Sequence, residues 1–176
     1  MVEGRGQDRS LEPITTEDLQ TLAKFARAHR ERWFRFEKPT GVYEDRFICS
    51  ALCQGAALHY VDGVNGVKDF DIYEFYADVP DVTIPYRAHW CYDFGSSKFG
   101  NQVKARLHSE YEGRRIDLFV RALKAGVDSN PVECVQNYLR QAKTTTATLL
   151  ATKPVVLLEP NDLLGTIAWP PCPPDS

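Results

Sequence analysis

The chain has 176 residues, of which 43% are hydrophobic and 26% are charged, and its formal net charge is −3. This composition is close to average globular usage, so a packed core is expected. The small negative charge gives no broad electrostatic attraction to nucleic acid. No apolar run approaches the roughly 18 residues that span a bilayer, and the polar start MVEGRGQDRS has no signal-peptide core. We therefore expect a cytoplasmic protein without a membrane partner.

The length fits one compact domain. We predict that this domain covers residues 15–168, between a disordered N-terminus over 1–14 and a proline-rich tail over 169–176. Glycine and charged residues dominate the first of these flanking segments, and clustered prolines cannot continue regular structure in the second. The five cysteines contain no CxxC pair and fit no common zinc module. We expect them to be small buried residues, with one thiol on the tail.

The first predicted element is a helix that begins after Thr15 or Thr16, either of which is a natural N-cap, and ends near Trp33. An apolar stretch over 45–61 follows it. Periodicity alone does not distinguish a strand followed by a helix from one buried helix in this stretch. Two glycine-containing pairs over 62–66 then mark a loop.

The second half of the chain contains most of the predicted strands. Aromatic and β-branched residues over 69–79 predict a strand, whereas prolines and glycines over 80–101 indicate a long loop or an insertion. Clean alternation over 103–111, followed by Glu-Gly and then RRIDLFVRAL over 114–123, predicts a hairpin. A helix over about 131–150 and a short strand over 153–160 complete an α+β (α/β) domain.

Two aspartates at the start of the 69–79 strand need a chemical explanation. Side chains alternate along a strand, so Asp69 and Asp71 point the same way. Phe70 and Ile72 would then point into the opposite layer. Two close carboxylates raise each other's pKa unless a positive charge lies between them, and Mg²⁺ meets this need because it prefers oxygen ligands. The alternative is that either aspartate simply caps a turn.

Asp117 is the third candidate ligand. It lies in an otherwise apolar strand, where a carboxylate is costly unless it lies at the edge of the sheet or has a partner. If its strand pairs beside the 69–79 strand, Asp117 approaches the aspartate pair. The three carboxylates would then hold two metal ions about 4 Å apart, an arrangement that activates an attacking oxygen and stabilises a leaving one.

Several basic residues near these aspartates have two interpretations each. Lys68 and Lys98 are candidates for contact with a triphosphate, or are simply solvated. Arg114 and Arg115 are candidates to neutralise the surroundings of Asp117 or to touch an acceptor, or they simply form a solvated hairpin edge. We interpret His59, on an apolar helix face, as a core histidine whose nitrogens are hydrogen-bonded.

Three short segments carry a family resemblance: QGAAL at 54–58, DFDI at 69–72 and RIDL at 115–118. Together they resemble the DNA polymerase β-like nucleotidyltransferase superfamily, nearest its small bacterial abortive-infection and minimal nucleotidyltransferases. Those proteins carry Gly-Gly or Gly-Ser before a short helix, then a loop, an acidic-x-acidic strand and a third acidic residue on a later strand. The resemblance implies a nucleotidyltransferase-like mixed β-sheet with flanking helices.

The resemblance also implies roles for individual residues. Gly55 and Ala56 stand where the family meets the nucleotide phosphates, since glycine lets backbone N–H groups approach phosphate at a helix start. Asp69, Asp71 and Asp117 stand at the catalytic and metal-binding carboxylates. Mg²⁺ or Mn²⁺ is the implied cofactor. Apart from the resemblance, we predict that Lys68 binds the nucleotide because it immediately precedes the acidic pair.

The implied reaction transfers a nucleoside monophosphate from an NTP to a hydroxyl of RNA, a protein or a small molecule. Ala56 offers no hydroxyl to phosphate, which favours an alternative: a non-catalytic protein of the same fold that binds nucleotide, RNA or a protein partner. Either the enzyme or the non-catalytic protein would be compatible with a role in a toxin–antitoxin pair or in phage defence. An unrelated α+β fold with a fortuitous D-x-D is a further alternative, and the oligomeric state is left open.

Overall fold

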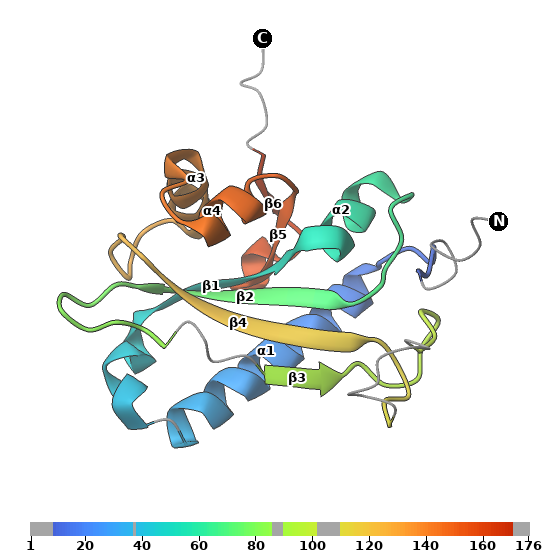
Figure 1. Cartoon of the computed structure of the whole chain (residues 1–176), viewed down its shortest axis with the longest axis horizontal. Coiled ribbons are helices and arrows are strands. Elements are labelled where there is room, and N and C mark those ends of the chain that lie inside the picture. The colour runs from blue at the N-terminus through green and yellow to red at the C-terminus, as the bar shows by residue number, and fades with distance from the viewer. Residues whose placement is uncertain (1–8, 37, 86–89, 102–109, 171–176) are drawn as a thin grey trace, which may run out of the picture.

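The computed structural model describes residues 9–36, 38–85, 90–101 and 110–170 of the chain. At its centre lies a six-stranded mixed sheet with the strand order β3-β4-β2-β1-β5-β6. Helix α1 lies on one side of this sheet, and α3 and α4 lie on the other (Figure 1). The predicted mixed sheet with flanking helices is therefore confirmed.

The sheet has long strands at its centre and short strands at its two edges, which limits the unpaired backbone at the edges. Its strands are β1 (Phe47–Cys53), β2 (Phe70–Ala77), β3 (Trp90–Asp93), β4 (Arg115–Leu123), β5 (Val155–Glu159) and β6 (Ile167–Trp169). The helices are α1 (Thr16–Phe36), α2 (Gln54–Asp62), α3 (Pro131–Gln141) and α4 (Thr145–Leu150), with 3₁₀ segments η1 (Lys38–Arg46) and η2 (Asn161–Leu163). Across the described ranges, no helix is long and apolar enough to cross a membrane.

The apolar stretch over 45–61 is a strand followed by a helix. β1 runs through it to Cys53, and α2 begins at the next residue. β1 pairs antiparallel with both β2 and β5, whereas β2 pairs in parallel with β4. This parallel pair places the 114–123 segment beside the 69–79 segment, the condition on which the approach of Asp117 to the aspartate pair depended.

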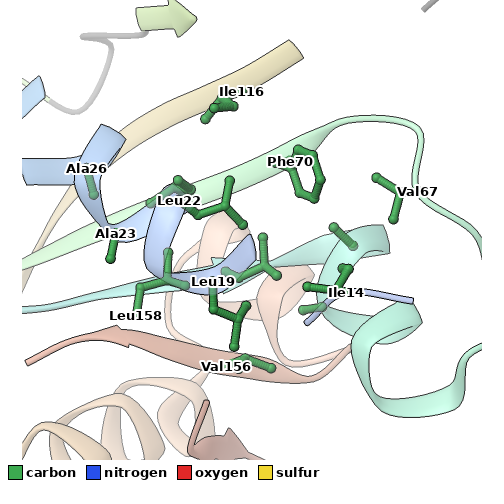
Figure 2. Close-up of a cluster of buried hydrophobic side chains, with 14 of the residues drawn as sticks. Ile14, Leu19, Leu22, Ala23, Ala26, Val67, Phe70, Ile116, Val156 and Leu158 are labelled. Atoms are coloured by element: carbon green, nitrogen blue, oxygen red, sulfur yellow. The ribbon is translucent and has the colours of Figure 1, made fainter. Parts of the chain in front are cut away.

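A reciprocal cap begins α1 where the sequence predicts it. The N–H of Thr15 donates to Asp18 Oδ2 at 2.7 Å, and the N–H of Asp18 donates to Thr15 Oγ1 at 3.4 Å. The helix then buries an apolar face against the sheet. Figure 2 shows this face in contact with side chains from β2, β4 and β5, and its labelled residues are Ile14, Leu19, Leu22, Ala23, Ala26, Val67, Phe70, Ile116, Val156 and Leu158.

A second apolar cluster covers the opposite face of the sheet, beneath α3 and α4. The sequence predicted one helix over 131–150 here, which is wrong. Ala142 has a left-handed backbone (φ 44°) that ends α3, and Thr144 then caps α4 by accepting from the N–H of Ala147 at 3.0 Å. A run of threonines at 144–146 favours this break because β-branched residues with side-chain oxygens prefer cap positions to helix interiors.

Other boundaries also differ from the prediction. The 80–101 segment contains β3, which pairs antiparallel with β4, so it is not only a loop. Residues 103–109 of the predicted hairpin lie outside the described residues, as do 1–8 and 171–176. Ser10 and Val67 exchange backbone hydrogen bonds of 2.9 and 2.7 Å, so the last part of the 1–14 segment packs on the domain. Trp169, predicted to begin the tail, ends β6.

Candidate functional site

The three predicted carboxylates lie together at the N-terminal ends of β2 and β4. In the parallel ladder Asp71 is the direct partner of Asp117, and Asp69 immediately precedes β2. The alternation predicted from the sequence holds, because Phe70 and Ile72 are buried in the cluster on the α1 side. The carboxylates therefore share the other face of the sheet.

Arg115 is the positive charge at the centre of this group. Its Nε donates to Asp117 Oδ2 at 2.8 Å, and its Nη2 lies 3.6 Å from Asp69 Oδ2. Of the two interpretations open for this arginine, the structure supports the one in which it neutralises the surroundings of Asp117. Arg114 instead turns inward, where its Nε donates to the carbonyl of Phe99 at 2.8 Å.

Asp71 is the member of the group that Arg115 does not hold. None of the described residues donates a hydrogen bond to it or forms an ion pair with it. Burial, reinforced by the charges of Asp69 and Asp117, raises the pKa of Asp71 to about 7, against smaller opposing effects of Arg115 and Lys153. Three carboxylates around one guanidinium thus leave an excess of negative charge that is centred on Asp71.

Asp117 also accepts a hydrogen bond from a thiol on the neighbouring strand β3. Cys91 on β3 is its ladder partner, and Cys91 Sγ donates to Asp117 Oδ1 at 3.1 Å. Burial and this hydrogen bond to a carboxylate raise the pKa of Cys91 to about 12, so the thiol stays protonated and acts as a donor. Sequence reasoning did not associate Cys91 with the site, because Cys91 and Asp117 become neighbours only through the β3–β4 register.

The predicted phosphate-contacting residues lie at the start of α2, beside the aspartate pair. Cys53 precedes this helix without a side-chain cap, so no N-cap side chain satisfies the N–H groups of its first turn. Gln54 has a φ of 59°, which is strained for a residue other than glycine. Gly55 and Ala56 follow it, and the three residues line a cavity with Asp69 and Asp71.

This cavity, which we call the α2–α4 pocket, has a volume of about 370 Å³. The predicted residues Gly55, Ala56, Lys68, Asp69 and Asp71 all line it, whereas Asp117 is not among its lining residues. Sequence reasoning missed its other walls, which come from the N-terminal segment, the first residue of α2, positions farther along β2 and β4, the end of α4 and the turn that follows it. These residues are Arg9, Gln54, Tyr73, Phe119, Leu149 and Lys153.

A larger hollow of about 670 Å³ lies at the opposite ends of the same strands. Tyr43, Arg121 and Tyr138 are among its lining residues, and Asp78 marks its position at the end of β2. Seven residues of extended chain separate Asp78 from Asp71, which corresponds to about 23 Å. Although this hollow is the larger of the two, it lies too far from the carboxylates to be their pocket. We therefore assign the candidate site to the α2–α4 pocket.

The donor set of the site fits a hard divalent cation in its chemistry, since all three predicted ligands are carboxylate oxygens. As the side chains stand, no group of three or more His, Cys, Asp or Glu residues within the described ranges is arranged to hold a metal ion. The position of Arg115 explains this. Its guanidinium binds two of the three carboxylates, so a cation would have to replace it there.

The structure also tests the predictions made for His59 and Lys98. His59 is a buried residue with both ring nitrogens bonded: Nδ1 accepts from the N–H of Gly66 at 2.9 Å, and Nε2 lies 3.0 Å from the carbonyl of Glu12. The interpretation as a core histidine is confirmed. Lys98 forms an ion pair with Asp18 at 2.8 Å, so it is held by α1 rather than by the aspartate pair.

No protein-family model matches the chain, and comparisons with curated proteins and with solved structures gave no match. The interpretation of this site therefore depends on its own geometry.

Proposed function

We propose that the protein is a Mg²⁺-dependent nucleotidyltransferase that transfers a nucleoside monophosphate from an NTP to a hydroxyl group. One observation carries the proposal. Asp71 and Asp117 are ladder partners on parallel strands, and Asp69 shares their face and contacts the same guanidinium as Asp117. A buried concentration of carboxylates beside a pocket is costly for folding, and such costs are typical of functional sites.

The order of elements supports the same proposal. A glycine at the start of a short helix, a loop, an acidic pair at the start of a strand and a third aspartate on a later strand follow one another along the chain. This is the order that the resemblance to the DNA polymerase β-like superfamily implied. The parallel pairing of β2 with β4 adds the proximity that such a site needs.

In this proposal Asp69 and Asp71 would hold Mg²⁺ or Mn²⁺, and Asp117 would complete the ligand set or act as the base. Bound there, the cation would polarise the α-phosphate and neutralise its charge. The acceptor oxygen would attack the α-phosphorus while the bond to pyrophosphate breaks, and the hydroxyl proton would pass to a carboxylate, with Asp117 as the candidate. RNA, a protein or a small molecule would supply the hydroxyl.

A second candidate function is favoured by a specific observation. Arg115 occupies two of the three carboxylates, and Ala56 offers no hydroxyl to a phosphate. Both features suit a non-catalytic protein of this fold that binds a nucleotide, RNA or a protein partner. Both candidate functions use the same pocket, but only the nucleotidyltransferase would turn over a substrate.

Two measurements test and separate these functions. Calorimetric titration with each NTP, with and without Mg²⁺, should show metal-dependent binding that is lost in the Asp69→Ala, Asp71→Ala double variant. Release of pyrophosphate in the presence of candidate acceptors then distinguishes transfer from binding alone. Absence of nucleotide binding to the wild-type protein under all these conditions would overturn the nucleotidyltransferase proposal.

A further inference from the structure

The α2–α4 pocket has a cationic wall that the family motif does not include. Arg9, Lys68 and Lys153 come from three separate segments and converge on one cavity with Asp69 and Asp71. Its volume of about 370 Å³ falls within the range of about 300–1,000 Å³ that is usual for small-molecule sites.

These cations are not committed to carboxylates. Among the residues that the structure describes, Arg9 donates to the backbone carbonyls of Asn65 at 3.5 Å and Gly66 at 3.3 Å and to no carboxylate. In the part of the chain that the structure describes, the side chains of Lys68 and Lys153 form no ion pair. Lys153 is half-buried, so its position is better defined by packing than that of a fully solvated lysine. Three such charges suit a ligand with several anionic oxygens.

An aromatic wall adjoins the cationic one. Tyr73 and Phe119 are ladder partners two positions along the strands from Asp71 and Asp117, and their rings stack with centroids 4.8 Å apart and an interplanar angle of 25°. Tyr73 is nearly covered, while Phe119 is half-buried and Leu149 is exposed above it. Two residues of strand correspond to about 7 Å, so a ligand that spans both walls needs an anionic end and a flat apolar end.

We propose, building on the nucleotidyltransferase proposal, that Lys153 is a polyphosphate-binding residue and that the pocket holds a nucleoside triphosphate with its base against Phe119 and Leu149. Lys153, with Arg9 and Lys68, would supply the phosphate contacts that a hydroxyl at position 56 would otherwise share. The triphosphate then lies beside Asp69 and Asp71, and the base lies farther along β2 and β4.

The test compares nucleotide affinities of purified full-length variants by calorimetry in the presence of Mg²⁺. Lys153→Met removes the charge and keeps most of the side-chain volume, and Lys153→Arg keeps the charge. Lys124→Met is the matched control, because Lys124 is exposed just beyond the far end of β4. Thermal unfolding of each variant, compared with the wild type, confirms that it is folded.

We expect Lys153→Met to weaken triphosphate binding by about tenfold or more, since a hydrogen bond to a charged group is worth at least this factor. The loss should be smaller for the corresponding monophosphate, whereas Lys153→Arg should stay within a few fold of the wild type and Lys124→Met should be unchanged. Equal affinities of the wild type and Lys153→Met for the triphosphate would overturn this inference alone. If the wild type binds no nucleotide, the nucleotidyltransferase proposal fails and this inference fails with it.

Discussion

Asp71 on β2 and Asp117 on β4 are direct partners in a parallel strand pair, and both are held on the face of the sheet that carries α3 and α4. This adjacency concentrates negative charge at a partly covered position, so it lowers the stability of the fold.

The first prediction concerns the charge on Asp71, whose folded-state pKa is about 7 against an ordinary value of 3.8. A raised carboxyl pKa contributes stability that is fully present below the unfolded value and is lost as the pH rises through about 7. Asp71→Asn should therefore match the wild type near pH 4 and be more stable at pH 8. A shift of this size corresponds to at most about 4 kcal/mol, and relaxation and solvent screening reduce it to about 1–2 kcal/mol.

Thermal unfolding in the presence of a chelator at the two pH values measures this difference. About 1–2 kcal/mol corresponds to an increase of roughly 2–8 °C in Tm for a domain of this size. A variant with the same advantage at both pH values would show that the Asn side chain, and not the loss of charge, accounts for the change.

The second prediction concerns Arg115 as a competitor of the metal. Its Nε lies 2.8 Å from Asp117 Oδ2, and this separation corresponds to about 1.5 kcal/mol of Coulomb attraction in bulk water and about 6 kcal/mol near a protein surface. Arg115→Met should therefore be less stable than the wild type without metal, yet bind Mn²⁺ about tenfold more tightly. Titration calorimetry measures the affinity, and Arg140→Met on the exposed face of α3 is the control. Weaker Mn²⁺ binding in Arg115→Met would mean that the guanidinium supports the metal rather than competes with it.

The third prediction concerns Glu159 at the end of β5. Its carboxylate accepts from Arg30 through two contacts of 3.0 Å, from Arg27 at 3.2 Å and from Ser50 at 2.9 Å. These partners hold its pKa below the ordinary 4.5, against the opposing effect of burial. Glu159→Gln leaves the buried part of Arg30 without its counter-ion and should cost about 2–4 kcal/mol at pH 7.

The pH dependence of this cost has a definite sign. A depressed carboxyl pKa contributes stability above the unfolded value, and this stability is lost as the pH falls through the folded value. Urea denaturation of the wild type and Glu159→Gln should therefore give stabilities that converge as the pH falls through the folded-state pKa of Glu159, which lies below 4.5. Glu44→Gln, at an exposed position, should stay within about 0.5 kcal/mol of the wild type at every pH. A constant gap between wild type and Glu159→Gln would contradict the assignment.

The fourth prediction concerns the close contact of two loops. A Cβ atom at Gly113 would lie 1.9 Å from the carbonyl oxygen of Gly95, and backbone atoms cannot move aside cheaply. Gly113→Ala should therefore destabilise the fold by about 2–4 kcal/mol and disturb the entry into β4. Nothing lies within 4 Å of a Cβ at Gly41, so Gly41→Ala is the matched control. A Gly113→Ala variant with wild-type Tm would show that the two loops separate without cost.

The sequence predicts the local elements of the site well because strand alternation needs no tertiary information. Asp69 and Asp71 on one face, with Phe70 and Ile72 on the other, follow from a period of two. The break between α3 and α4 was missed because apolar spacing continues across it, whereas the cap at Thr144 competes with the helix only through its side-chain oxygen.

The walls of the α2–α4 pocket show where such prediction ends. Tyr73 and Lys153 come together only after β2 and the α4–β5 turn are placed on the same side of the sheet. Likewise, Cys91 meets Asp117 through an antiparallel register that no single segment encodes. Local sequence carries the type of each residue, and only the order of the strands brings these residues into contact.

The parallel β2–β4 pair also has a consequence for the order in which the chain folds. Its partner aspartates are 46 positions apart in the sequence. Pairing over such a separation carries the entropy cost of closing a long loop before stabilising contacts form. Chains that have formed only the β1–α2–β2 unit therefore carry Asp69 and Asp71 without Asp117. The proposed binding of a ligand through all three carboxylates would therefore be possible only in chains in which β4 has docked.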